Sequence, residues 1–198
     1  MTATIGSIVL LQVQRSPLKL GEGADRRYHT APITPVERLL MTRNGVIGLV
    51  GETEILDVHP RHHPARKNED GRHGVSLGFT AHYEAMQRRF GNHMVLGCAG
   101  ENLIVETAER ITPEVAARGF LLLDRKGRPK GYLGDVAVTH PCRPFAHFAQ
   151  GGHGATGDLK EVLAFLDGGT RGFYCTFYAD KEPVTVERGD LVALLDSE

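Results

Sequence analysis

The sequence predicts a mainly β fold, a closed or nearly closed β-barrel with a few short peripheral helices. About eight or nine short β-prone segments are spread along the chain and bounded by Gly, Pro and Asn turn residues. Only about two or three short helical patterns lie between them, and their irregular placement does not fit a parallel βαβ sheet. No composition shift marks a boundary, so we expect a single domain over residues 1–198, with the motif-bearing part at about 45–195.

The composition limits the classes of protein to be considered. Hydrophobic residues make up 41% and charged residues 24% of the chain, which excludes disorder along its whole length. The net charge of -1 argues against a general nucleic-acid binder but leaves room for a local basic pocket that takes an anionic small molecule. No signal-peptide pattern and no apolar run of membrane-spanning length is found, so we expect a cytoplasmic protein with reduced thiols and no membrane partner.

The first quarter of the chain predicts strands joined by polar connections. Residues 5–13 are apolar and rich in β-branched side chains, which indicates a strand, and a polar loop follows at 16–30. Residues 36–42 fit either a strand or a short helix. Asn44-Gly45 is a strong hairpin signal, and we expect a strand at 46–50 after it.

A long basic loop and a helix follow. Residues 54–72 are rich in His, Arg and Lys and are interrupted by prolines, which predicts an exposed loop. Aromatic and Met side chains then recur at helical spacing between a Thr80 N-cap and a Gly91 stop, which predicts a helix whose stripe packs into the core: Phe79, Tyr83, Met86 and Phe90.

Two further helices are predicted from their capping residues. Thr112-Pro113-Glu114 combines an N-cap, a proline in the first turn and an acidic residue, and that helix stops at Gly119. Asp158 and Glu161 resemble a capping box before an apolar helical face. The remaining strands are predicted at 103–105, 120–123, 132–139, 171–179, 184–186 and 191–195, with 120–123 and 132–139 forming a hairpin.

One place combines residues suited to reactive chemistry. Cys142 follows the end of a predicted strand, with Arg143 beside it and His140 two positions before it. A neighbouring cation stabilises a thiolate, which is both the nucleophile and the metal ligand, so this arrangement suggests a functional cysteine. The alternative is that Cys142 is a small buried hydrophobic residue, as most free cysteines are. Cys98 and Cys175 are too distant in sequence to form a Cys-x-x-Cys motif with it.

Several further motifs occur in order along the chain. A Gly-rich stretch at 45–52 precedes the basic loop, and a strand and helix follow at 75–90. Then come Ala99-Gly100-Glu101-Asn102-Leu103, Gly134-Asp135 before Pro141-Cys142, Arg171-Gly172-Phe173-Tyr174, and Gly189-Asp190. In this combination the chain resembles the MOSC family, named after the C-terminal domain of molybdenum-cofactor sulfurase, as a stand-alone member of bacterial type.

The resemblance implies a β-barrel and one important cysteine, carried over here onto Cys142. In characterised relatives this cysteine carries sulfur as a persulfide or ligates the molybdenum of a pterin cofactor, and some relatives reduce N-hydroxylated compounds. We therefore expect a molybdenum-cofactor-binding protein that acts as such a reductase, or as a sulfur or cofactor carrier, through Cys142. The resemblance also implies molybdenum ion binding, pyridoxal phosphate binding, and an electron-transfer or sulfur-donor protein as partner.

The expected cofactor carries a phosphate, so its site needs cations and N–H donors. We expect the turn at Gly100 to supply N–H groups, Asn102 to orient a loop or a pterin edge, and Glu101 to hold the turn or pair with a basic residue. Arg143 stands where the family often has a lysine, and it keeps the charge in a planar, forked geometry. The basic loop completes the predicted cofactor-binding set with Arg61, His62, His63, Lys67, Arg72 and His73.

Two other functions remain open. A binding module without chemistry of its own would deliver cofactor or sulfur to a partner protein, which agrees with the lack of a cysteine-rich electron-transfer segment in the sequence. A divalent-metal hydrolase would use histidines of the basic loop, although the chain has no His-Glu-x-x-His motif. Its candidate ligands are His59, His62, His63 and His73.

Overall fold

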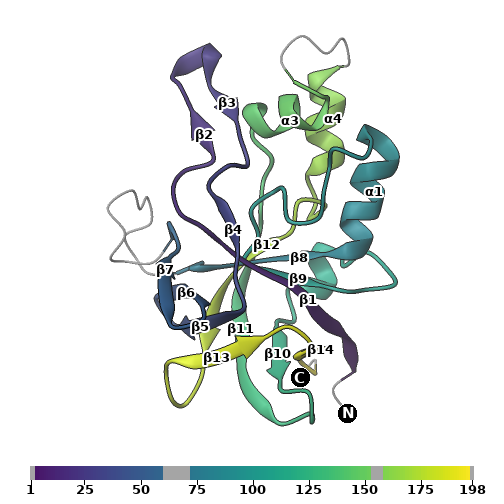
Figure 1. Ribbon diagram of the computed structural model, residues 1–198. Helices are drawn as coiled ribbons and strands as arrows, with labels where there is room; N and C mark the ends of the chain where they lie inside the picture. The colour runs from purple at the N-terminus through teal and green to yellow at the C-terminus, as the bar shows by residue number, and fades with distance from the viewer. Residues whose placement is uncertain (1–2, 60–71, 153–157, 197–198) are drawn as a thin grey trace.

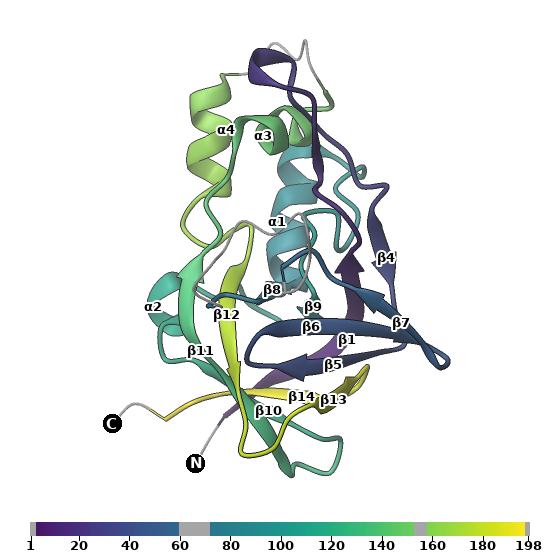
Figure 2. The ribbon, with the colours of Figure 1, turned by 90° about the vertical axis from the view of Figure 1, so that its left-hand side faces the viewer.

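The computed structural model describes residues 3–59, 72–152 and 158–196. A barrel of strands forms the lower part of the molecule in Figure 1, and short helices and a small hairpin gather at its upper end, an arrangement that Figure 2 shows from the side. Four residues of the predicted basic set, Arg61, His62, His63 and Lys67, lie outside the described residues.

Within the described part of the chain, seven strands close into a barrel, which confirms the predicted fold class. They are β1 (Thr4–Gln14), β8 (Val75–Phe79), β9 (Leu103–Val105), β10 (Phe120–Leu123), β11 (Pro129–Val138), β12 (Phe173–Tyr178) and β14 (Leu191–Leu194). Their order is β14-β10-β11-β12-β8-β9-β1, and the pairing of β1 with β14 closes the ring. The pair β8 and β9 is parallel, and the other pairs in the ring are antiparallel.

Strand β1 is long enough to pair with three other strands in succession. Its first part pairs with β14, residues 8–11 pair with β9, and residues 12–14 pair with β4 (Ile33–Pro35). Gly6 permits the close approach that this path requires, because a Cβ there would lie 1.7 Å from the carbonyl oxygen of Glu106. The end of β1 that leaves the ring leads directly to the candidate site.

A second sheet packs beside the barrel. Its order is β13-β5-β6-β7, and the β5–β6 hairpin turns at Arg43 and Asn44, which confirms the predicted turn and settles residues 36–42 as mainly strand. Its inward side chains share one hydrophobic core with the barrel, as Leu39 and Met41 are fully buried there. The strands are β5 (Arg38–Thr42), β6 (Gly45–Val50), β7 (Thr53–Leu56) and β13 (Val184–Glu187).

A second core cluster lies at the end of the barrel that carries the helices. The helices α1 (Thr80–Phe90), α3 (Arg143–Ala149) and α4 (Leu159–Leu166) gather there with the hairpin of β2 (Lys19–Leu20) and β3 (Arg27–Tyr28) (Figure 1). The ring of Tyr28 packs edge-on against Phe145 of α3, with centroids 4.9 Å apart. This contact attaches the hairpin to the helices. The remaining elements are the short helix α2 (Pro113–Ala116) and one 3-10 turn, η1 (Gly23–Asp25).

The predicted helices are confirmed, with one corrected cap. The hydroxyl of Thr112 accepts a hydrogen bond from the N–H of Val115, and Asp158 accepts one from the N–H of Lys160. At α1 the N-cap position is Phe79, and the hydroxyl of Thr80 instead donates to the carbonyl of Thr107. Thr80 therefore joins α1 to the segment after β9 and does not cap the helix.

One helix was not predicted from the sequence, and one loop was predicted to begin too early. The stretch after Cys142 forms α3, because Pro144 stands in the first turn, where a helix tolerates proline. Cys142 is the N-cap of this helix and lies four residues after the end of β11, which agrees with its predicted position after a strand. The predicted exposed loop also begins later than expected, since 53–56 form β7 and the side chain of Asp57 is fully buried.

None of the helices in the described ranges is both long enough and apolar enough to cross a membrane.

Candidate functional site

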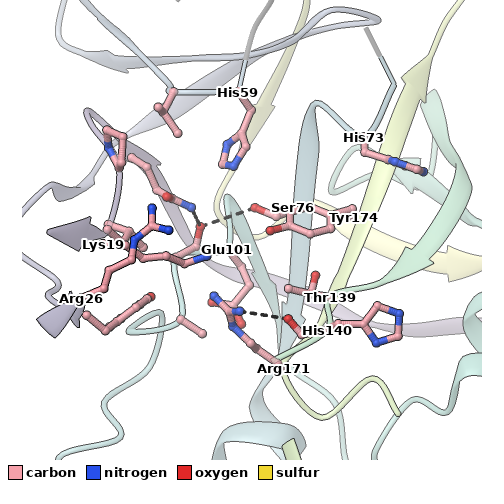
Figure 3. A pocket seen from close by; sticks show the side chains of 17 residues that line it. Lys19, Arg26, His59, His73, Ser76, Glu101, Thr139, His140, Arg171 and Tyr174 are labelled. Carbon is pink, nitrogen blue, oxygen red and sulfur yellow. Dashed lines mark hydrogen bonds between the residues drawn. The ribbon is translucent and has the colours of Figure 1, made fainter. Parts of the chain in front are cut away.

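A pocket of about 440 Å³ opens at the end of the barrel, between the β2–β3 hairpin and the ends of several strands (Figure 3). This volume lies within the range of small-molecule and cofactor sites. Segments far apart in the sequence contribute its walls. The lining residues are Gln14, Pro17, Leu18, Lys19, Arg26, Tyr28, Val58, His59, His73, Ser76, Ala99, Gly100, Glu101, Thr139, His140, Arg171 and Tyr174.

The pocket is strongly basic. Lys19 and Arg26 come from the hairpin above it, and Arg171 comes from the turn before β12. Three histidines add further donors, whereas Glu101 is the one carboxylic acid among the described lining residues. Such a lining favours an anionic ligand.

Arg171 is the most deeply placed of these cations. Its side chain is 7% exposed, its guanidinium lies over the ring of Phe145 at 4.4 Å, and its Nη1 donates to the carbonyl of His140 at 3.3 Å. Burial lowers its pKa, but the charges of Tyr28, Tyr174 and nearby acidic groups outweigh burial and raise the pKa above its ordinary value. Its buried Nε has no hydrogen-bond partner among the described residues. A ligand oxygen would satisfy this donor.

Glu101 lies at the inner end of the pocket. Its Oε2 accepts a hydrogen bond of 2.6 Å from the hydroxyl of Tyr83, which in turn accepts one from the N–H of Ala99. The side chain is almost fully buried, and this burial raises its pKa to about 7 despite the hydrogen bond from Tyr83 and the charge of Arg171. The carboxyl therefore changes between its neutral and ionised forms near neutral pH.

The turn at Gly100 fits tightly against β1. Gly100 has a φ of 91°, and a Cβ there would lie 2.6 Å from Cδ1 of Leu18 and 2.7 Å from Nε2 of Gln14. The expected N–H donors of this turn are engaged inside the protein, because Gly100 donates to the carbonyl of Gly97 and Ala99 donates to Tyr83. Gly100 lines the pocket, and its carbonyl accepts from the Gln14 side chain at 2.6 Å.

Asn102 holds the site together from behind. It is fully buried and is not a lining residue. Its Oδ1 accepts from the N–H and hydroxyl of Ser76, and its Nδ2 donates to Oδ2 of Asp57 at 2.9 Å. Of the two roles expected for Asn102, these contacts describe the orientation of a loop.

Asp57 and His59 form a pair at the pocket; His59 was considered only as a metal ligand of the hydrolase alternative, and Asp57 was not predicted as a site residue. Oδ1 of the buried Asp57 lies 2.5 Å from Nδ1 of His59, and the His59 ring lines the pocket beside Tyr174. Burial opposes ionisation of Asp57, but the hydrogen bonds and charge of His59 and the N–H of Gln14 lower its pKa. The signal in the sequence was Asp-x-His directly after a β-prone segment, within what was expected to be loop.

Cys142 lies beside the pocket and does not line it. It is half-buried, packs against the helical core cluster, and is close enough to Arg171 to raise the pKa of that guanidinium. Cys98 and Cys175 are buried, and burial raises the pKa of both thiols, so Cys142 is the most accessible of the three cysteines. Arg143, its neighbour in sequence, is exposed and is not a lining residue.

Of the cofactor-binding residues predicted in and beside the basic loop, Arg72 and His73 lie within the described residues, and His73 lines the pocket. His73 has a φ of 56°, with its N–H donating to the hydroxyl of Thr176. Arg72 is exposed and is not among the lining residues. Over residues 3–59, 72–152 and 158–196, no group of three or more His, Cys, Asp or Glu side chains could hold a metal ion. Two ligands of the hydrolase alternative, His62 and His63, lie outside these ranges.

Comparison with known proteins supports the fold. The chain matches no family model, and no curated protein resembles it in sequence. The crystal structure of the YuaD protein from Bacillus subtilis is similar with a TM-score of 0.55 and 15% identity, over 98% of this chain and 95% of that one. The crystal structure of a hypothetical protein has a TM-score of 0.56 and 14% identity, over 99% of this chain and 70% of that one. At such identities the similarity concerns the fold alone.

Proposed function

We propose that the protein binds a molybdenum cofactor in the basic pocket and uses Cys142 as its reactive thiol. It would act as a reductase of N-hydroxylated compounds or as a sulfur or cofactor carrier. The observation that carries this proposal is the buried, unpartnered Nε of Arg171 in a pocket with one carboxyl among its described lining residues. A pterin phosphate is an anion of the kind that such donors bind.

The residues present fit this group in charge and size. Arg171, Lys19 and Arg26 would hold the phosphate, with His59 and His73 as further donors. Bound molybdenum would supply two-electron redox chemistry, for which a thiolate is a suitable soft ligand. The hairpin above the pocket would keep water from the bound cofactor, because Tyr28 attaches it to α3 and donates a hydrogen bond to the carbonyl of Cys98.

The position of Cys142 favours a second candidate. Because this cysteine stands beside the pocket and is not a lining residue, it suits a module that passes sulfur or cofactor to a partner protein. The carrier role needs an accessible thiol more than a cavity, and Cys142 is the most exposed of the three cysteines.

The experiment compares molybdenum and pterin in wild type, Cys142→Ala and Arg171→Met, each purified from a host that makes the cofactor. We expect both contents to fall in the two variants, whereas Cys175→Ala, which removes a buried thiol of the barrel core, controls for general damage. Unchanged contents in Cys142→Ala and Arg171→Met would overturn cofactor binding at this site. A persulfide on Cys142 by mass spectrometry, with no turnover of N-hydroxylated compounds by loaded protein, would select the carrier module.

A further inference from the structure

Glu101 is placed as a buried carboxyl without an ion pair. Among the residues that the structure describes, no cation lies within ion-pair distance of its side chain. Isolating a carboxylate from water costs free energy unless the group is paired or takes up a proton. Yet Glu101 is one of the residues that line the pocket.

The backbone around Glu101 makes room for the carboxyl. A Cβ at residue 78 would lie 2.8 Å from Oε1 of Glu101, and a Cβ at residue 172 would lie 2.4 Å from the carbonyl oxygen of Leu77. Glycine at residue 78 therefore makes room for the carboxyl itself, and glycine at residue 172 lets the start of β12 approach the backbone of β8. A backbone that leaves space for an energetically costly buried acid indicates a role beyond packing.

The hydrogen bonds decide which oxygen carries the proton. Oε2 accepts from the hydroxyl of Tyr83, whose own oxygen accepts from the N–H of Ala99. The proton of a neutral Glu101 therefore belongs on Oε1, which becomes a donor. A protonated carboxyl in an apolar site is a known means of donating a hydrogen bond to an oxyanion, as in ketosteroid isomerase.

We propose that Glu101 recognises an oxyanion in the pocket by donating a hydrogen bond from protonated Oε1 to a ligand oxygen, beside the guanidinium of Arg171. The proton comes from solvent, so binding above neutral pH takes up one proton. The ligand class is a tetrahedral oxyanion, either the phosphate group of a larger cofactor or a free inorganic anion. The proposal shares the pocket with the proposed function but does not require molybdenum or Cys142.

The titratable groups facing Glu101 come from four segments. They are Tyr83 of α1, Cys98 of the connection before β9, Tyr28 of β3 and Arg171 before β12. Tyr28, Tyr83 and Cys98 have pKa values raised by burial, and the pKa of Arg171 is also raised. Glu101 is thus the group of this cluster whose charge changes near pH 7.

The first measurement is the infrared carbonyl band of a protonated carboxyl between pH 5 and 9, in protein free of cofactor. We expect a band that titrates near pH 7 in wild type, disappears in Glu101→Gln and persists in the control Glu84→Gln, whose side chain is exposed on α1. Tyr83→Phe removes a hydrogen bond that stabilises the carboxylate, so its band should titrate at higher pH. The proposal would be overturned if wild type showed no such band, or if its band persisted in Glu101→Gln.

The second measurement is calorimetry of sulfate binding, because sulfate does not titrate in this range. At pH 8, in two buffers of different ionisation enthalpy, wild type should take up about one proton more per sulfate than Glu101→Gln. The Kd of wild type should also rise about tenfold more than that of the variant for each pH unit above 7. The pocket histidines are present in both proteins, so the difference isolates Glu101. Equal proton uptake in both proteins, with sulfate and with the methyl phosphate described below, would contradict the proposal.

A parallel titration with methyl phosphate separates the two ligand sources. Proton uptake with both anions supports recognition of any oxyanion, and uptake with methyl phosphate alone supports a phosphate monoester. Binding of neither anion would overturn the proposal. An infrared band together with no retained molybdenum would remove the proposed cofactor binding and leave this inference intact. Retained molybdenum without the band would support cofactor binding and overturn this inference.

Discussion

The carboxylate of Asp57 lies 2.5 Å from the Nδ1 atom of His59, and it is fully buried while the His59 ring faces the pocket. The same carboxylate accepts hydrogen bonds from the N–H of Gln14 and from the side chain of Asn102. One buried acid therefore connects β1, the Gly-Glu-Asn turn and a histidine of the pocket wall. Asp57 positions His59, and it belongs to the structural support of the site.

We expect Asp57→Asn to destabilise the protein by about 1–3 kcal/mol, since its amide group would face donors that now bond to a carboxylate. Urea unfolding would measure the change in the free energy of unfolding. Asp180→Asn, at an exposed position after β12, should leave this free energy nearly unchanged. Equal stability of Asp57→Asn and wild type would show that the hydrogen-bond network around Asp57 contributes little.

The buried His82 should make the protein less stable in acid. Burial, with the nearby Arg110, lowers its pKa to about 4, and its Nε2 accepts a hydrogen bond from the N–H of Ile111. Between pH 4 and 6.5 the unfolded chain binds a proton that the folded chain excludes, so stability rises with pH across this window, by up to about 3 kcal/mol from this group.

The variant His82→Gln isolates this contribution, because it keeps an acceptor and cannot titrate. We expect the stability difference between wild type and His82→Gln to shift in favour of wild type as pH rises from 4 to 6.5. Unfolding in urea at several pH values would measure it. A difference that stays constant over this range would mean that His82 does not titrate as the structure indicates.

Glu101 should act on stability with the opposite sign. Its pKa is raised to about 7 by burial, so the unfolded chain releases a proton near pH 4.5 that the folded chain holds to about pH 7. Stability therefore falls as pH rises through this window. Glu101→Gln removes the titration and keeps an acceptor for Tyr83, so it should stabilise the ligand-free protein by up to about 3 kcal/mol more at pH 8 than at pH 4. Equal effects at both pH values would contradict the raised pKa.

Arg171 and Arg143 provide a matched test of which arginine serves the pocket. Arg171 lines it with an unpartnered Nε, whereas Arg143 is exposed and lies outside the lining. We expect Arg171→Lys to weaken sulfate binding about tenfold or more, since lysine lacks the planar set of donors. Arg143→Lys should leave the Kd unchanged in calorimetry. A larger effect of Arg143→Lys on the Kd would mean that the anion binds at Arg143, beside Cys142, and not at Arg171.

The barrel could be predicted because its signals are local. Alternating β-prone runs, the Asn44-Gly45 turn and the caps Thr112 and Asp158 each act within a few residues. Helix α3 was missed because it has only seven residues and the prolines before and after Cys142 indicate an irregular segment. Its apolar face is stabilised by packing against β3, a contact between segments far apart in the sequence.

The site could be predicted only in part. The Gly100-Glu101 turn was found from its motif, but the arginines that line the pocket are Arg26 and Arg171, and Arg143 is not among them. Lys19, Arg26 and His59 reach the pocket through the path of the β2–β3 hairpin and the end of β7. The spacing of these residues in the sequence does not predict that they lie together at the pocket. Their proximity depends on how β1 leaves the barrel and on pairings between strands that are distant in the sequence.

The fit of Gly100 against β1 leads to a last prediction. Gly100→Ala would place a Cβ 2.6 Å from Leu18 and 2.7 Å from the Gln14 side chain, at a φ of 91° that alanine rarely adopts. Gly127→Ala is the control, since Gly127 has a φ of 79° but nothing within 4 Å of its added Cβ. We expect Gly127→Ala to cost about 1 kcal/mol from backbone strain alone, and Gly100→Ala to cost about 1–3 kcal/mol more from overpacking. Equal losses in urea unfolding would mean that the turn moves away from β1 without cost; the unequal losses that we expect would show that the turn carrying Glu101 is held rigidly against the barrel.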